Sequence, residues 1–173
     1  MPDATGLELI AAAVRDQLGE DAVAGTLYAH EQATLEVAPA SVRDAIAYLS
    51  EEADETFPLL MSVHGVDYFP EEPRFGVHYE LLSMERTDRL RVKTRVGIDE
   101  PRLPTVVDLF AGANFQEREV YDMFGVEFDG HPDLRRILMP EDYEGHPQRR
   151  DFPIGGEAVL FTYNEHQVPR WYE

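Results

Sequence analysis

Two alternating runs joined by a polar turn decide the fold class of this 173-residue chain. Residues 75–96 read FGVHYELLSMERTDRLRVKTRV. Apolar and polar side chains alternate on either side of the turn at residues 85–88, and a period of two is typical of strands with one buried face. Because so short a turn cannot carry a parallel crossover, the two strands are expected to pair antiparallel.

Three further strands are expected on the N-terminal side of this hairpin. The apolar run at residues 59–66 predicts a strand beside it. Residues 23–38 hold two short strand-like runs separated by the polar residues 30–32, which favours a second hairpin. Strands with such short connections predict a mixed, mainly antiparallel sheet.

Two amphipathic helices complete the N-terminal part of the chain. Apolar residues recur at helical spacing over residues 7–18, with a capping box from Thr5 to Glu8 before them and Gly19 after them. Pro39 opens a second helix, whose apolar residues form one stripe: Val42, Ala45, Ile46 and Leu49. This order of helices and strands predicts an α+β domain of two layers.

The sequence pattern changes after Pro104. We expect a short helix at residues 105–110 and a longer one at residues 114–124, followed by little periodicity and by recurrent Gly and Pro. The predicted organisation is therefore an α+β core domain over residues 1–124, which ends in the longer helix, and a long irregular C-terminal extension over residues 125–173. So long an irregular segment is unusual inside a compact monomer, so the extension is expected to dock on partner chains.

The termini of the helix at residues 114–124 carry capping signals. Asn114 is a suitable N-cap, and Glu117 stands at the position that reaches back to it. Gly125 supplies a left-handed stop at the other end. Capping explains these residues without any function.

The same helix carries a cluster of charged residues. Arg118 and Asp122 are four residues apart on one face, so Arg118 is expected to pair either with Asp122 or with a partner across an interface. Glu119 with Asp122 is also a candidate carboxylate pair for acid–base catalysis. The commoner cause of such a cluster is a structural ion-pair network.

Two histidines, His131 and His146, each stand in a Gly-His-Pro triplet. Two imidazoles and an intervening carboxylate would be a chemically reasonable zinc or iron site. Metal-binding helices, however, space their histidines a few residues apart on one face. The alternative is that each histidine donates a hydrogen bond that holds its own loop.

Arginine pairs and a basic stripe concentrate positive charge in an acidic chain. Guanidinium groups bind carboxylates and backbone carbonyls together, so Arg135-Arg136 and Arg149-Arg150 suit a loop surface buried against another protein, with solvent-exposed ion pairs as the alternative. A stripe on one face of the last strand either pairs with acids of this chain or docks an acidic partner. Its residues are Arg89, Arg91, Lys93 and Arg95.

Composition excludes several classes of function. The chain has no Cys, so it has no disulfide, thiolate zinc site, cysteine nucleophile or cysteine-ligated cluster. Its 15 basic and 34 acidic residues give a formal charge of −19, which repels phosphate backbones, so nucleic acid is not an expected partner. We expect a cytoplasmic chain without direct membrane insertion, because no stretch approaches the roughly 18 apolar residues of a membrane helix and the start lacks a signal-peptide pattern. Nucleotide-binding, metalloprotease and nucleophile-elbow motifs are absent too, which favours a subunit of an assembly.

The C-terminal part of the chain resembles the signature of the 30 kDa subunit family of respiratory complex I. Three runs carry the resemblance with their spacing intact: residues 117–125 (EREVYDMFG), 130–138 (GHPDLRRIL) and 144–153 (EGHPQRRDFP). The residues taken as family motif and partner interface are Glu117, Arg118, Glu119, Tyr121, Asp122, Gly125, His131, Pro132, Asp133, Arg135, Arg136, Gly145, His146, Pro147, Arg149, Arg150 and Asp151.

The resemblance implies a non-catalytic subunit in the peripheral arm of a proton-pumping NADH:quinone oxidoreductase. Such a subunit packs against the 49 kDa quinone-site subunit (of type D), near the iron–sulfur subunits of types B, I and G, and supports electron transfer from NADH to quinone. FMN, iron–sulfur clusters and quinone then belong to partner subunits, and this chain holds no cofactor, metal or catalytic residue. Its expected place is the cytoplasmic side of the cell membrane, as a peripheral membrane subunit.

Two alternatives stay open. The same signature occurs in relatives linked to ferredoxin, F420, formate or hydrogenase, so this chain does not identify the electron donor. From a different class, a free-standing carboxylate or metal enzyme would use Glu119, Asp122, His131 and His146.

Overall fold

A five-stranded sheet forms one layer of the structure and helices form the other. The structure, a computed structural model, describes residues 2–53 and 56–153. The strands are β1 (Val23–Ala29), β2 (Gln32–Val37), β3 (Leu59–Asp67), β4 (Phe75–Ser83) and β5 (Asp88–Val96), in the spatial order β1-β2-β5-β4-β3. β2 and β5 pair parallel and the other neighbours pair antiparallel, so the predicted mixed, mainly antiparallel sheet is confirmed.

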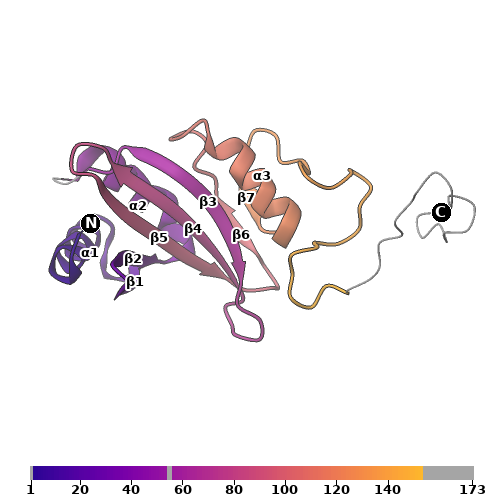
Figure 1. Cartoon of the computed structure of the whole chain (residues 1–173), viewed down its shortest axis with the longest axis horizontal. Helices are drawn as coiled ribbons and strands as arrows, with labels where there is room; N and C mark the ends of the chain where they lie inside the picture. Colours follow the sequence, from indigo (N-terminus) through magenta and orange to yellow (C-terminus); the bar gives the residue numbers. More distant parts are fainter. Residues whose placement is uncertain (1, 54–55, 154–173) are drawn as a thin grey trace, which may run out of the picture.

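The helical layer covers one face of this sheet (Figure 1). α1 (Ala4–Leu18) packs on β1 and β2, and α2 (Val42–Ala47) packs on β5. A 3-10 turn, η2 (Pro39–Ser41), leads into α2, and a π-helical turn, η3 (Tyr48–Glu52), continues it. The predicted apolar stripe of this second helix is buried throughout, which confirms the two-layer α+β prediction.

α3 (Ala113–Phe124) packs along the edge strand β3, at the far end of the sheet from β1 (Figure 1). The approach is close at Gly65, where a Cβ atom would lie 2.5 Å from the ring of Phe124. The side chain of Gln116 accepts the backbone N–H of Val63 at 2.6 Å, and so covers a donor on the edge of the sheet. β3 and α3 therefore form one packed unit.

The start of α1 differs from the prediction. Its N-cap is Asp3, whose carboxylate accepts the backbone N–H of Gly6 at 2.7 Å. The predicted capping box from Thr5 to Glu8 is wrong, because Thr5 already lies inside the first turn that Asp3 caps. Gly19 ends the helix with φ 101°, as predicted.

The start of α3 also differs. Its N-cap is Gly112, without a side-chain hydrogen bond, and Asn114 lies inside the helix. Glu117 does not reach back to the N-terminus; it accepts the Thr105 hydroxyl at 2.5 Å and the Val106 N–H at 2.8 Å. The predicted capping by Asn114 and Glu117 is therefore wrong, because Glu117 satisfies donors of the preceding turn.

That preceding turn replaces the short helix predicted at residues 105–110. The carbonyl of Val106 accepts the N–H groups of Leu109 at 3.1 Å and Phe110 at 2.9 Å, which closes a single turn. The prediction of a helix is wrong because the Glu117 side chain accepts the Thr105 hydroxyl and the Val106 N–H. These donors at the start of the turn are therefore satisfied by α3.

The core domain extends one strand beyond the predicted boundary. β6 (Arg102–Pro104) pairs parallel with β7 (Glu127–Asp129), and α3 connects the two strands. β7 adds Phe128, and the residue before it Val126, to the single apolar core. The irregular extension thus begins at Gly130 rather than at residue 125, and its residues 154–173 lie outside the described residues.

The face of the sheet away from the helices carries charged residues in ion pairs. Three cations of the predicted basic stripe contact acids of this chain, which is one of the two alternatives given for them. The pairs are Arg91 with Glu80, Lys93 with Glu36 and Arg95 with Glu71. The ring of Tyr68 also lies over Lys93 and Arg95.

Candidate functional site around the C-terminal end of α3

The described part of the extension, residues 130–153, binds the C-terminal turn of α3. The last carbonyls of a helix have no donor within the helix. In this structure each of the last four carbonyls of α3 accepts a hydrogen bond. The carbonyl of Tyr121 accepts the N–H of Gly125 at 2.8 Å, and that of Asp122 accepts Nδ1 of His146 at 3.0 Å. The carbonyl of Met123 accepts the N–H of Gln148 at 3.2 Å, and that of Phe124 accepts Nε of Arg149 at 2.8 Å. The cation of Arg149 also suits the negative end of the helix dipole. The third run of the motif therefore acts as a cap for α3.

Gly125 makes this cap possible. Its φ of 77° is the left-handed conformation predicted for the end of the helix. A Cβ atom there would lie 2.5 Å from Arg149 NH2 and 2.5 Å from His146 Nε2. The glycine thus permits both the turn and the approach of the two capping side chains.

The carboxylate of Asp122 organises the second run of the motif. It is fully buried, and its Oδ2 accepts three successive backbone N–H groups, from Ile137, Leu138 and Met139, at 3.0, 2.8 and 2.9 Å. Its Oδ1 accepts Arg136 NH1 at 2.6 Å. Burial alone would raise the pKa of Asp122, but these hydrogen bonds outweigh it and lower the pKa.

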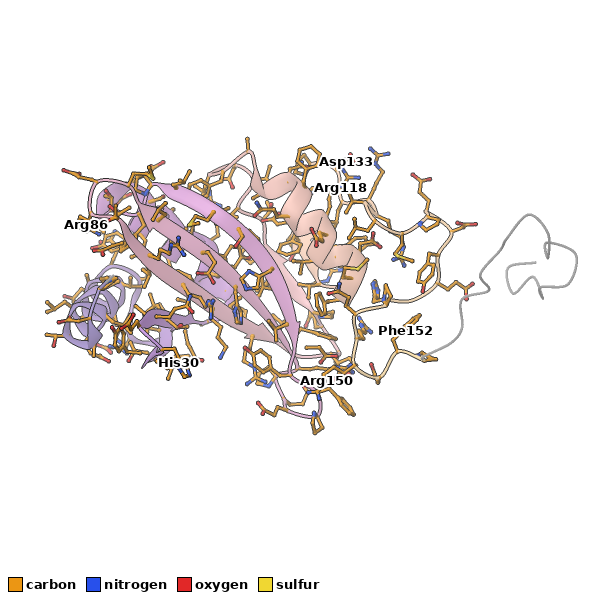
Figure 2. All side chains as sticks on the ribbon, viewed as in Figure 1. His30, Arg86, Arg118, Asp133, Arg150 and Phe152 are labelled. Carbon is orange, nitrogen blue, oxygen red and sulfur yellow. The ribbon has the colours of Figure 1, made fainter. Side chains whose placement is uncertain are left out.

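Arg118, one turn earlier on α3, does not pair with Asp122. Its Nε donates to the carbonyl of Arg135 at 3.0 Å and its NH2 to the carbonyl of Arg136 at 3.1 Å. The predicted pair between Arg118 and Asp122 is wrong, because the loop takes the lone pairs of the carboxylate. Figure 2 shows Arg118 beside the loop that carries Asp133. α3 therefore binds this loop through both a donor and an acceptor.

Arg136 and Arg149 find their partners within the chain. Arg136 binds Asp122 with one nitrogen and the carbonyl of Gly145 with the other, at 2.8 Å, so it joins the second and third runs of the motif. Arg149 donates to α3 and lies over the ring of Phe75 on β4, 4.9 Å from its centroid. These are the carboxylate, carbonyl and ring contacts expected of such guanidinium groups, made inside this chain.

Other predicted site residues lie at the surface. Arg135 forms a bidentate pair with Asp133, at 2.7 and 2.8 Å, and both side chains reach solvent in this chain. Glu119 and Pro132 are exposed, and Pro147 is half-buried. The side chains of these residues make none of the contacts with α3 described above.

The two histidines hold the loops to α3. Nδ1 of His131 accepts the N–H of Asp133 at 3.0 Å, so Nε2 carries the proton that it donates to the carbonyl of Asn114 at 3.1 Å. His146 donates from Nδ1 to the backbone carbonyl of Asp122. Burial lowers the pKa of His146, and the nearby cations Arg149 and Arg136 lower it further. This arrangement matches the alternative in which each histidine holds its own loop.

Glu117 is a buried acid beneath this site. Burial raises its pKa to about 7, against the opposing effect of the hydrogen bonds from Thr105 and Val106. His131 Nε2 lies 3.9 Å away, and the hydroxyl of Tyr79, also buried, has no hydrogen-bond partner among the described residues. Because the carboxyl group is fully buried, no substrate reaches it in this structure.

A buried guanidinium that the sequence did not mark fixes the end of the described extension. Arg74 is 3% exposed and donates to both oxygens of Asp67, at 2.9 and 2.7 Å, and to both oxygens of Asp151, at 2.9 and 2.5 Å. Asp67 also accepts the backbone N–H of Arg150 at 2.7 Å, and Figure 2 places Arg150 at the end of the sheet near Phe152. The hydrogen bonds that the Asp67 carboxylate accepts from the Arg74 side chain hold the pKa of Asp67 far below the usual range. Position alone gave no signal for Arg74, because its acidic partners are distant in sequence or separated from it by a loop.

The contacts at the C-terminal end of α3 stabilise the loops that pack on it. Of the candidate carboxylate pair, Glu119 is exposed, whereas Asp122 is buried and accepts hydrogen bonds from Arg136 and from three backbone N–H groups. Over residues 2–53 and 56–153, no group of three or more His, Asp or Glu side chains could hold a metal ion. Within the same ranges, no helix combines the length and the apolar composition that crossing a membrane requires.

Comparison with known proteins relates the chain to subunits of respiratory complexes. The family model described as "Respiratory-chain NADH dehydrogenase, 30 Kd subunit" matches residues 35–158. The C-type subunit of NADH-quinone oxidoreductase from Roseiflexus sp. (strain RS-1) is 42% identical over 170 residues, which cover 97% of this chain and 94% of the relative. The corresponding subunit of Herpetosiphon aurantiacus is 51% identical over 118 residues, 68% of this chain and 69% of the relative.

Two solved structures share the fold. The trypsin-resistant fragment of Nqo5 aligns with a TM-score of 0.61 and 33% identity, over 74% of this chain and 98% of the fragment. A chain of the membrane-bound sulfane sulfur reductase, an archaeal respiratory membrane complex, aligns with a TM-score of 0.68 and 28% identity, over 85% of both chains. The α+β fold thus recurs in the Nqo5 fragment and in a chain of an archaeal respiratory membrane complex.

Proposed function

The chain belongs to the family of the respiratory-chain NADH dehydrogenase 30 kDa subunit, and we propose that it is a non-catalytic peripheral-arm subunit of a proton-pumping NADH:quinone oxidoreductase. In this proposal it packs against the 49 kDa quinone-site subunit, near the iron–sulfur subunits of types B, I and G. It supports electron transfer from NADH to quinone, while FMN, iron–sulfur clusters and quinone are held by partner subunits. Its proposed location is the cytoplasmic side of the cell membrane.

The geometry of the loop at residues 136–139 supports this docking role. Its backbone N–H groups point inward to Asp122, which fixes the loop on α3. Two of its apolar side chains reach solvent, since Leu138 is 60% exposed and Ile137 is 37% exposed. A rigid backbone that presents apolar side chains to solvent suits a protein interface, because little conformational entropy is lost on binding.

Purification of the tagged chain from native membranes tests the proposal. We expect flavin-containing and iron–sulfur subunits and a quinone-site subunit to co-purify, with NADH-driven quinone reduction in the preparation. Recovery of the chain alone, with turnover or a stoichiometric metal, would support the free-standing enzyme instead.

A matched pair of variants tests the interface itself. Leu138→Glu introduces a charge where an apolar contact is proposed, and Leu27→Glu does the same on β1, where the leucine is 52% exposed. Because both side chains reach solvent, both variants should fold. Loss of co-purifying subunits with Leu138→Glu alone supports the proposed interface, and equal recovery of the complex with both variants contradicts it.

A second candidate is the same subunit role in a complex with another electron donor or acceptor. The likeness to a chain of the archaeal sulfane sulfur reductase favours it, since that likeness covers 85% of both chains. The purified complex separates the two candidates: ferredoxin-, F420- or hydrogen-driven turnover without NADH oxidation would select the second.

A further inference from the structure

An apolar groove lies between α1 and η3. α1 lies at the opposite end of the molecule from residues 130–153 (Figure 1). Its volume is about 360 Å³. The residues that line it include Gly6, Leu9, Ile10, Ala13, Tyr48 and Ala53. The motif residues and the loop at residues 136–139 have no part in it.

The shape of the groove suits a helix. Gly6, Leu9, Ile10 and Ala13 follow one another along α1 with spacings that place them on one face. Leu9 is 68% exposed and stands between two small side chains, Gly6 and Ala13. Small side chains let the backbone of another helix approach, and the projecting leucine fits between its side chains.

The charges that border the groove are negative. Asp3 stands one turn before Gly6 and Asp16 one turn after Ala13, so acids mark both ends of the α1 wall. Glu51 and Glu52 are exposed at the end of η3, between Leu49 and Ala53 of the other wall in sequence. The cation of α1, Arg15, follows Ala13 by two residues and therefore lies on another face.

We propose that this groove docks an amphipathic helix of a partner protein, with apolar side chains at helical spacing and Lys or Arg along its flanks. An apolar floor with acidic walls is complementary to such a helix in both polarity and charge. Anionic membrane surfaces and a second copy of this chain, whose formal charge is −19, would be repelled by the same walls. The inference rests on the proposed function only in expecting the helix in another subunit of the complex.

Binding of model peptides to the full-length chain tests the chemistry of the groove. We expect an amphipathic Leu/Lys peptide to shift the amide resonances of Gly6, Leu9, Ala13 and Ala53, and a Leu/Glu peptide of equal length to leave them in place. Leu9→Ser should weaken the Leu/Lys peptide about tenfold, because it removes the apolar anchor, whereas Leu27→Ser should not. Equal binding of the two peptides, equal effects of the two variants, or stronger binding to phosphatidylglycerol vesicles than to the peptide would overturn the proposal.

Photo-crosslinking in the assembled complex tests the occupant. A photoreactive amino acid at position 9 should crosslink to one segment that carries Lys or Arg and apolar residues at helical spacing, and the same group at position 27 should not. Absence of that crosslink at position 9 in an intact complex overturns the proposal. If the chain does not co-purify with any complex, the proposed function fails. The peptide experiment alone then decides whether the groove binds a cationic amphipathic helix.

Discussion

Asp122 and Arg136 form the ion pair on which the irregular extension is built, with 2.6 Å between Oδ1 and NH1. Asp122 is fully buried and Arg136 is 14% exposed. The same carboxylate accepts the backbone N–H groups of the three residues that follow Arg136. One side chain of α3 therefore holds this loop, and the number of residues between them must allow the loop to reach it. The spacing of the first two motif runs therefore has a structural cause.

Replacement of Asp122 should destabilise the chain strongly. Asp122→Asn keeps the shape but removes the charge, and its amide nitrogen faces either Arg136 or the loop N–H groups as a donor facing a donor. We expect a loss of about 3 to 5 kcal/mol in the free energy of unfolding, as for a buried ion pair that loses one partner. Urea unfolding measures it, and faster amide exchange at residues 137–139 locates it. Glu119→Gln, at an exposed site on the same helix, is the control, and an equal midpoint for the two variants would contradict the role of Asp122.

Arg136→Lys should lower the stability of the isolated chain. A lysine has one point charge and cannot bind Asp122 and the carbonyl of Gly145 together, as the two nitrogens of Arg136 do. We expect a loss of about 1.5 to 3 kcal/mol, the range for hydrogen bonds to charged groups. Arg135→Lys, in the neighbouring exposed pair, should leave the thermal midpoint unchanged. If both variants melt like the parent chain, Arg136 serves a partner chain rather than this fold.

Local patterns predicted the regular parts of this fold well. In the hairpin at residues 75–96 and in α2, one face is buried. Residues at a fixed spacing in the sequence share a face of a strand or helix, so the pattern of apolar residues predicts which face is buried. The five strands and their mixed pairing followed from these patterns and from the short connections. The domain boundary was placed too early, because β7 is short and pairs with β6 across the whole of α3.

The site was harder to predict because its contacts compete over long distances in sequence. Arg118 has the spacing of a partner for Asp122, yet loop N–H groups and Arg136 take that carboxylate. Glu117 has the position of a cap, yet it accepts donors from the turn that precedes the helix. Spacing alone gives the possible partners of a side chain, and the folded chain selects among them.

Glu117 predicts an unusual dependence of stability on pH. Its pKa in the folded chain is about 7, whereas its ordinary value is 4.5. The folded state therefore binds the proton more tightly than the unfolded state, so the contribution of Glu117 to stability is largest below its ordinary pKa and is lost as pH rises through about 7. Glu117→Gln keeps an acceptor for Val106 and a polar group for Thr105, but it cannot ionise. We expect this variant to gain about 3 kcal/mol over the parent chain between about pH 4 and about pH 8.

Urea unfolding of both chains across this pH range measures the effect. The comparison uses the difference between variant and parent, so that other titrating groups cancel. A difference that does not change with pH would show that the pKa of Glu117 is the same in the folded and the unfolded chain, and it would contradict the prediction. Tyr79→Phe tests the environment of the neighbouring Tyr79 hydroxyl. This hydroxyl is buried and has no hydrogen-bond partner among the described residues, so its removal should not lower the free energy of unfolding.

Gly125 and Gly112 stand at the two ends of α3 and give a matched pair of alanine substitutions. Gly125 has φ 77°, and a Cβ atom there would meet Arg149 and His146 at 2.5 Å, whereas Gly112 has φ −66° and no described atom within 4 Å of its Cβ position. Gly125→Ala therefore combines an unfavourable backbone conformation with displacement of two capping side chains, and we expect a loss of about 1 to 3 kcal/mol.

Gly112→Ala should leave the free energy of unfolding nearly unchanged, because an alanine adopts its backbone conformation without strain. The difference between the two variants isolates the cap at the C-terminal end of α3, since both add a single methyl group. Hydrogen exchange at the amide of Gln148, which donates to the carbonyl of Met123, reports on the cap directly. Faster exchange there in Gly125→Ala alone would show that the third motif run is held by the end of the helix. Equal exchange in both variants would instead mean that the Arg74 contacts with Asp67 and Asp151 suffice to hold it.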